Sequence, residues 1–189
     1  YRGAGKMSGE NIVTIQRADV QVVQTFIDTM VGIPKFSYPA RQNGAEKPPG
    51  EFAHIRLLEE YAVGIPNNRI VSQTDLETTF RVISPTRLRF RVGVVDTTGI
   101  PSTMILHGWT TEAMKLLMIQ SGYGFIRCTP LSNESAKLEK EWEMRQGFSI
   151  ELYSTRIFEY TTNNITSLRA DGEFVEGSKS YLLNFEINE

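Results

Sequence analysis

The stretch from Thr86 to Val95 constrains the fold more than any other part of the sequence. Apolar residues alternate there with arginines and one glycine: Leu88, Phe90, Val92 and Val94 against Arg87, Arg89, Arg91 and Gly93. Successive side chains of a β-strand point to opposite faces of its sheet, so this period of two predicts a half-buried strand. One face of the strand lies in the core, and the other exposes three arginines.

Other segments with strand character extend this sheet. They are Phe52–Glu60, Leu76–Ile83, Tyr123–Thr129, a long ribbon from Trp142 to Tyr160, and a last strand from Tyr181 to Ile187. Ser84-Pro85 predicts a tight turn that pairs Leu76–Ile83 with the arginine-bearing strand as a hairpin, and Asp171-Gly172 predicts another turn.

The long ribbon shows the same alternation. Phe148, Ile150 and Leu152 share one face, and Phe158 and Tyr160 continue it after a phase change near Ser154. The charged run before the ribbon, from Glu134 to Glu143, is typical of a solvated loop or a short helix.

Two segments have apolar residues at helical spacing. The first is Asp19–Met30, with Asp19 as its N-cap and with Gly32 and Pro34 as its stop. The second is Ser102–Gln120, capped by Ser102 or Thr103. Gly108 weakens its first turns by about 1 kcal/mol relative to alanine, which leaves a start nearer Thr110 open.

The stretch from Pro34 to Gly50 is rich in proline and glycine and poor in apolar residues, so we expect an extended arm or long loop. No linker divides the chain, and the sequence predicts one domain over residues 1–189. Its parts are a helix over 18–32, the arm over 34–50, strands and the main helix over 51–129, and the ribbon with a C-terminal strand over 142–189. The fold class is α+β: an antiparallel-rich mixed sheet with two main helices packed on one face.

Composition excludes several classes of protein. Lys plus Arg is 20 and Asp plus Glu is 22, so the formal net charge is -2. This balance disfavours a protein that grips nucleic acid through bulk charge. We expect a globular protein that is made in the cytoplasm, because no apolar run approaches the roughly 20 residues of a membrane span and Tyr1–Glu10 is unlike a signal peptide.

The residues that could carry chemistry lack the necessary spacing. His54 and His107 belong to no metal-binding pattern, and Cys128 lies in an apolar strand pattern, where cysteine is usually a small buried hydrophobe. A Cys128 nucleophile with either histidine is the enzymatic alternative. We therefore expect no catalytic residues, no metal and no cofactor, and not an enzyme.

The arginine row is the main polar candidate. One interpretation is a solvated sheet face that discourages edge pairing. The other is a face that meets an acidic partner or lines a passage for DNA, with Arg127 from a neighbouring strand added to Arg87, Arg89 and Arg91.

The order of these segments resembles the neck or tail-terminator family of long-tailed bacteriophages over about Asp19–Tyr160. The residues that carry the resemblance are Gln42-Asn43-Gly44, Pro48-Pro49-Gly50-Glu51-Phe52-Ala53, the arginine strand ending in Asp96, Glu112-Ala113-Met114-Lys115-Leu116-Leu117, and the ribbon start Glu141-Trp142-Glu143-Met144-Arg145-Gln146-Gly147-Phe148. Family members commonly have a polar, proline-rich approach to the strand and a charged start to the late ribbon.

The resemblance implies a structural subunit of a ring, expected to be hexameric, that caps the phage tail tube and joins the tail to the head. Its partners would be copies of itself, the tail tube protein and head–tail connector or collar proteins, with DNA passing through the lumen without sequence specificity. The protein would lie in the virion neck after synthesis in the host cytoplasm, with no membrane involved.

Candidate contact residues follow from this interpretation. The arm would contribute Phe36, Tyr38, Arg41, Asn43 and Lys47 to contacts between subunits. The ribbon would contribute Trp142, Arg145, Phe158 and Tyr160, while Arg87, Arg89, Arg91 and Arg127 would face the lumen or a neighbour.

Three alternatives stay open. The nearest is another neck, head-completion or tube-like virion subunit, which filament formation would favour. A small-ligand-binding α+β protein would show a stable monomer with a deep apolar pocket. A nucleic-acid-binding module is disfavoured by the net charge.

Overall fold

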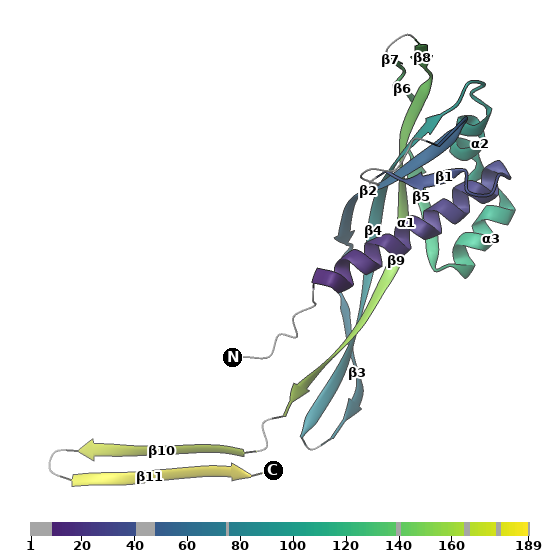
Figure 1. Ribbon diagram of the computed structural model, residues 1–189. Helices are drawn as coiled ribbons and strands as arrows, with labels where there is room; N and C mark the ends of the chain where they lie inside the picture. The colour runs from purple at the N-terminus through teal and green to yellow at the C-terminus, as the bar shows by residue number, and fades with distance from the viewer. Residues whose placement is uncertain are drawn as a thin grey trace. The chain divides into compact units, whose positions relative to one another are not determined.

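The computed structural model describes residues 9–40, 48–74, 76–138, 141–164, 167–176 and 179–188, and describes side chains within 16–40, 48–74, 76–135 and 144–164. It confirms the α+β class (Figure 1). Three helices occur among these residues: α1 (Gly9–Val31), α2 (Ile100–Gly108) and α3 (Glu112–Gln120). None of them is long and apolar enough to cross a membrane.

A mixed sheet of seven strands organises the described residues. Its strands are β1 (Ser37–Pro39), β2 (Phe52–Ala62), β3 (Asn67–Gln73), β4 (Glu77–Val95), β5 (Tyr123–Cys128), β6 (Ser132–Asn133) and β9 (Arg145–Asn163). The order is β1-β2-β4-β9-β5, with β3 also paired to β4 and β6 to β9. The short β1 runs parallel to β2, whereas the β2–β4, β3–β4, β5–β9 and β6–β9 pairs are antiparallel.

The contacts divide the chain into two compact units. The larger unit holds residues 6–66 and 84–156, and the smaller holds residues 1–5, 67–83 and 157–189. Strands β4 and β9 each contribute residues to both units. The single domain expected from the sequence stays a prediction.

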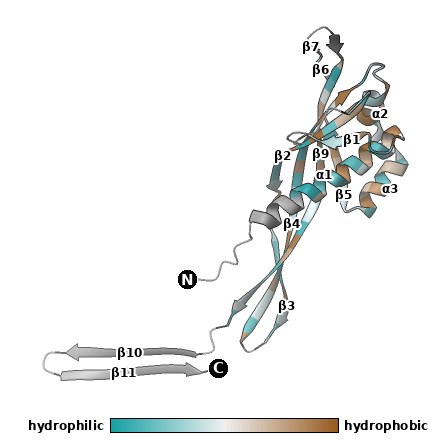
Figure 2. Cartoon of the chain, viewed as in Figure 1, coloured by the Kyte–Doolittle hydropathy of each residue, from teal (hydrophilic) through white to brown (hydrophobic). Residues whose placement is uncertain are grey.

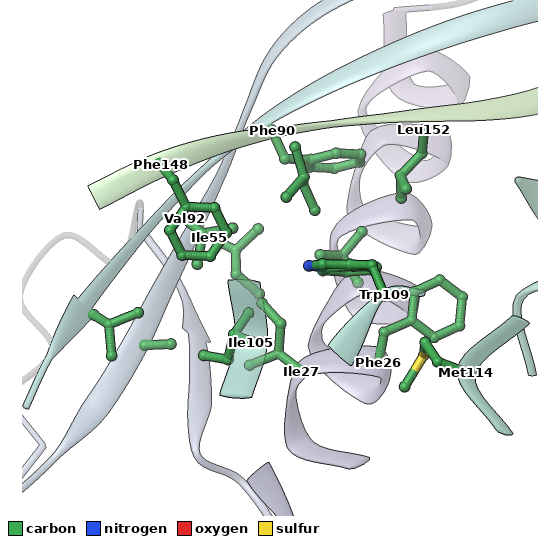
Figure 3. Packing of buried hydrophobic residues seen from close by; sticks show 14 of the residues in the cluster. Phe26, Ile27, Ile55, Phe90, Val92, Ile105, Trp109, Met114, Phe148 and Leu152 are labelled. Atoms are coloured by element: carbon green, nitrogen blue, oxygen red, sulfur yellow. The ribbon is translucent and has the colours of Figure 1, made fainter. Parts of the chain in front are cut away.

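The core of the larger unit lies between the three helices and one face of the sheet. Figure 3 shows α1 residues Phe26 and Ile27 packed with Trp109 and with alternate residues of the strands. Trp109 is fully buried, lies edge-on to Phe26 at 6.2 Å between ring centroids and stacks on Phe125 at 6.0 Å. Fully burying one large apolar side chain contributes about 1.5–3 kcal/mol, so this cluster is the main source of the unit's stability.

Hydrophilic and hydrophobic residues mix along the strands of the larger unit, as the colours of Figure 2 show. On β4, Leu88, Phe90, Val92 and Val94 are fully buried, and on β9 so are Phe148, Ile150 and Leu152. The buried face expected from the sequence is therefore confirmed for these segments. The opposite face is less exposed than expected, since Ser149 and Glu151 of β9 are 4% and 3% exposed.

The first helix differs from its expected start. It begins at Gly9, ten residues before the expected cap, so Asp19 lies inside the helix and is 1% exposed. Its C-terminal end is as expected: Gly32, just after the last residue of α1, has a φ of 74° and donates its N–H to the Asp28 carbonyl. The apolar stripe with Val23 and Phe26 in the core is confirmed.

The second expected helix is two helices. Helix α2 has Gly99 as its N-cap, with a φ of 73°, and ends at Gly108; Thr111 caps α3. Neither Ser102 nor Thr103 is a cap. Gly108 ends α2 where a Cβ would collide with the Met30 side chain of α1, so its lack of a side chain permits the close approach of the two helices.

The hairpin expected at Ser84-Pro85 is wrong. Strand β4 runs through both residues, and the strand that precedes it, β3, was not expected at all. Pro85 is tolerated because β4 changes its partner there, pairing with β3 up to Ile83 and with β2 from Thr86. A proline has no N–H to donate, and no ladder bond is needed at this change of partner.

Two further segments were misassigned. Strands β10 (Ser167–Glu176) and β11 (Lys179–Asn188) pair over their whole length, and Asp171-Gly172 lies inside β10 rather than in a turn. The charged run after Glu134 forms the paired strands β7 (Ala136–Leu138) and β8 (Glu141–Glu143) instead of a loop or helix.

Candidate interaction surface

The sheet face that points away from the core carries the arginine row. Arg87, Arg89 and Arg91 are 27%, 37% and 30% exposed, so each is half-buried rather than freely solvated. Their partners come from strands on both sides of β4. This face of the larger unit is the candidate interaction surface, which we call the arginine face.

Glu151 of β9 is the centre of one charge cluster on this face. Its side chain is only 4% exposed and forms ion pairs with Arg87 and with Arg127, the latter at 2.8 Å. Arg87 also lies over the Tyr61 ring at 5.8 Å, a distance that allows a cation–π contact. A buried carboxylate between two guanidinium groups makes these arginines structural as well as basic.

The remaining arginines have weaker partners. Arg89 pairs with Glu59 at 3.5 Å, and Arg91 pairs with Glu134 and donates to the Ser132 hydroxyl at 3.1 Å. Arg56 of β2 lies opposite Arg91 in the register, is exposed, and has no carboxylate partner among the described residues. It was missed in the sequence because β2 lacks the strict alternation of β4.

The arginine face is therefore a nearly compensated surface. Its printed ion pairs and register bring Arg56, Arg87, Arg89, Arg91 and Arg127 together with Glu59, Glu134 and Glu151, and alternation along β9 adds Arg145. The excess of positive charge is small, and Arg56 is its most available part. Paired arginines contribute little to long-range attraction because their partners cancel their fields.

A second polar network lies on the core side of the larger unit. Buried Asp19 of α1 accepts hydrogen bonds from the Tyr123 hydroxyl at 2.6 Å and from both terminal nitrogens of Arg156, at 3.1 and 2.5 Å. Arg156 also donates to Glu60 at 2.8 Å. One arginine thereby connects α1, β2 and β9, and the tyrosine adds β5.

The network shifts two pKa values. Burial, together with the hydrogen bond to Asp19, raises the pKa of Tyr123. Burial alone would lower the pKa of Arg156, but its hydrogen bonds to Asp19 and Glu60 outweigh that effect and raise it. Both residues therefore keep the protonation state that their hydrogen bonds require.

The start of the expected arm is held by α1. Asp28 accepts hydrogen bonds from the backbone N–H groups of Lys35 and Ser37, both at 2.9 Å, and from the Ser37 hydroxyl at 2.7 Å. Phe36 is 3% exposed in the core, so its side chain is not available to a neighbouring subunit. Tyr38 packs edge-on against Phe52 at 6.3 Å. The other arm candidates, Arg41, Asn43 and Lys47, lie outside the described residues.

The ribbon candidates have different environments. Phe158 is 42% and Tyr160 38% exposed, and Tyr160 stacks on Phe80. They do not continue the buried face of Phe148 to Leu152 as expected. Arg145 is half-buried, and the Trp142 side chain lies outside the described residues.

The residues weighed for chemistry are placed apart from one another along the fold. His54 lies on β2, opposite Gly93 of β4. His107 is exposed in the last turn of α2, and Cys128 is the last residue of β5. Burial raises the pKa of Cys128 to about 12, which keeps the thiol protonated and disfavours its use as a nucleophile. Among the described residues, no group of His, Cys, Asp and Glu is arranged to hold a metal ion.

One groove opens at the edge of the larger unit. It has a volume of about 570 Å³ and lies between α1, with Gln16, Arg17 and Val20, and the strand residues Ile55 and Leu57. Polar and charged side chains line much of it. Most pockets for small ligands are enclosed and mainly apolar, so this groove does not favour the ligand-binding alternative.

The chain belongs to the family of the phage neck terminator protein, whose family model matches residues 15–178. The match extends beyond both ends of the expected resemblance and includes β10. A comparison with curated proteins found no match.

Family membership defines a structural role in the neck of a bacteriophage. It also indicates contacts with other head or tail proteins of the virion.

Proposed function

We propose that this protein forms a ring of six copies that caps the tail tube and joins the tail to the head connector. The observation that carries the proposal is the family match over residues 15–178. A ring is the closed form of a head-to-tail interface, whereas an open arrangement of the same interface would polymerise.

The anchored arm supports contacts between neighbouring copies. Asp28 holds Lys35 and Ser37 beside α1, and the Ala40 N–H donates to the Ile55 carbonyl, so the described start of the arm is fixed. A segment whose start is already held in place loses less conformational entropy when it binds a neighbouring copy, and its prolines reduce that loss further. Tyr38 and the residues beyond it are the proposed contact segment.

The arginine face supports a role either at the lumen or against a neighbouring subunit. Its ion pairs leave a small positive excess, which suits passage of DNA because a strongly basic lumen would retain the phosphate backbone. Arg56 is the proposed residue of first contact, since it has no carboxylate partner among the described residues.

We also propose the tail tube protein and a connector or collar protein as partners, and synthesis in the host cytoplasm.

Electron microscopy of lysates from phage with and without this gene tests the proposal. Loss of the gene should give filled heads beside unattached tails, with tails that are overlong or irregular. Joined virions of normal tail length without the gene would overturn it, and filaments of the purified protein would favour a tube-like subunit instead.

A further inference from the structure

The described sheet of the smaller unit has one apolar and one polar face. Phe80 of β4 lies opposite Ile70 of β3 in the register and stacks on Tyr160 of β9, with 5.3 Å between ring centroids. Residues two positions apart share a face, which adds Phe158. These four residues, Ile70, Phe80, Phe158 and Tyr160, form what we call the ribbon face.

The opposite face of the same strands is mainly polar, although it includes the exposed Ile157. Arg81 pairs with Glu159 at 2.7 Å, and the hydroxyls of Thr79 and Thr161 are 3.1 Å apart. This separation of polar from apolar residues is the pattern of a sheet whose apolar face is covered. On the ribbon face, however, Ile70 is 53%, Phe158 42% and Tyr160 38% exposed. No described helix belongs to this unit.

The sequence of the β10–β11 hairpin alternates between apolar and mostly polar positions. Its register puts four pairs at positions of one face: Leu168 with Ile187, Ala170 with Phe185, Gly172 with Leu183, and Phe174 with Tyr181. The positions between them are mostly polar, and include Arg169 opposite Glu186. A two-stranded hairpin alone is marginally stable in water, so its apolar face requires a partner surface.

The connection between the two elements limits what the hairpin can cover. Asn164 is fixed to the β3–β4 turn: its N–H donates to the Leu76 carbonyl, its side-chain amide donates to Thr74, and it accepts from Thr78, all at 2.7 Å. Strand β10 begins three residues later, at Ser167. Three residues reach at most about 10 Å, and stacked sheets lie about 10 Å apart. For the hairpin to cover the ribbon face of its own copy, these three residues would have to be fully extended across the space between the two stacked sheets. The hairpin of another copy has no such restriction.

We propose that the β10–β11 hairpin of one copy covers the ribbon face of a second copy. This inference rests on the proposed ring and names the surfaces that join its subunits. The contact is head-to-tail: each copy gives one hairpin and receives another, and the chain of contacts ends only when the ring closes.

A mixing experiment with two full-length variants tests the interface. Phe158→Asp disables the ribbon face and leaves the hairpin intact, whereas Phe185→Asp disables the hairpin and leaves the ribbon face intact. Masses are measured by size-exclusion chromatography with light scattering, and circular dichroism checks that each variant is folded. The matched control for Phe158→Asp is Ile157→Asp, and the matched control for Phe185→Asp is Asn184→Asp. Each control changes the preceding residue, which occupies a position on the other face of the same strand.

The expected result is an oligomer for the wild type and both controls, and monomers for each variant alone. An equimolar mixture of the two variants should give a one-to-one complex, because one functional hairpin then meets one functional ribbon face. Equal masses for the wild type and Phe158→Asp would overturn the inference, whether the face binds a different protein or nothing. A lower melting temperature for Phe158→Asp, with no complex in the mixture, would overturn it in favour of a hairpin packed on its own chain.

This failure is distinct from failure of the proposed function. The masses are measured on purified protein, whereas the neck role is read from joined or unjoined virions after loss of the gene. A neck protein that associates through another surface would fail the mixing test and still leave heads and tails separate when its gene is lost.

Discussion

Arg156 and Asp19, 137 positions apart, form a bidentate ion pair: the Arg156 Nη1 and Nη2 atoms donate to the Asp19 Oδ1 and Oδ2 atoms at 3.1 and 2.5 Å. The pair joins the middle of α1 to β9 at the last residue that β9 contributes to the larger unit. Asp19 is 1% exposed, and this partner and the Tyr123 hydroxyl supply the hydrogen bonds to its buried carboxylate.

We predict that Arg156→Met lowers the free energy of unfolding by about 3 kcal/mol. This is the lower end of the cost of removing one partner of a buried pair, because Arg156 is 21% exposed. The double variant Asp19→Asn with Arg156→Met should recover part of the loss. Urea denaturation at pH 7 measures both values.

The matched control for that pair lies on the surface. Arg81 and Glu159 are 44% and 47% exposed at a comparable distance, so Arg81→Met should cost less than about 1 kcal/mol. Equal losses at Arg81 and Arg156 would contradict the structural role of the buried pair.

Gly93→Ala should destabilise the larger unit by about 1–3 kcal/mol, the usual cost of overpacking. A Cβ at Gly93 would collide with the His54 ring, which lies across from it on β2. Adding His54→Ala to the variant should relieve part of the loss, and chemical denaturation measures the coupling. Gly124→Ala is the control: its Cβ would meet Tyr153 at an ordinary 3.7 Å, so stability should stay unchanged or rise slightly.

Alkaline pH should weaken the fold through Cys128. Burial raises its pKa from 9.0 to about 12, so the folded state holds the thiol proton more tightly than the unfolded state does. The contribution is fully present below about pH 9 and is lost as pH rises towards 12. The free energy of unfolding should therefore fall less between pH 8.5 and 10.5 in Cys128→Ala than in the wild type. Parallel pH profiles for the two proteins would rule out this effect.

The arginine face allows charge and stability to be separated. Arg56→Glu should change the free energy of unfolding by no more than about 0.5 kcal/mol, because Arg56 is exposed and lies opposite Arg91. If this face contacts an acidic partner or DNA, the same variant should reduce the titre of phage that depend on it. Normal titre with stable protein would remove Arg56 from the interface.

Arg87→Gln is the informative comparison. It leaves the nearly buried Glu151 with Arg127, which is 63% exposed, as its remaining ion-pair partner among the described residues. We expect this variant to lose stability as well as titre, measured by thermal unfolding of the purified protein. Its effect on phage would therefore say less about contact than the effect of Arg56→Glu.

The sequence predicted those parts of the fold that local physics determines. Alternation identified the buried face of β4 and the core residues Phe148, Ile150 and Leu152 of β9. When one face of a strand is covered, apolar residues recur at every second position. Gly32 and Pro34 marked the end of α1 because only glycine readily takes the positive φ found there.

The missed features depend on partners distant in the sequence. Ser84-Pro85 has the composition of a turn, but β4 passes through it because β3 and β2 share that edge. Asp19 has the composition of a cap, yet its partners Tyr123 and Arg156 lie 104 and 137 positions away. For the candidate surface, alternation predicted the arginines of β4, but their pairing with Glu151 and Glu134 depends on which strands lie beside β4 and could not be predicted.

A cryo-electron-microscopy reconstruction of the virion neck tests the central claim most directly. We predict a closed ring of this chain between the last ring of the tail tube and the head connector, with the arginine face towards the lumen or an adjacent subunit. A neck in which other proteins fill that position, and from which this chain is absent, would contradict it.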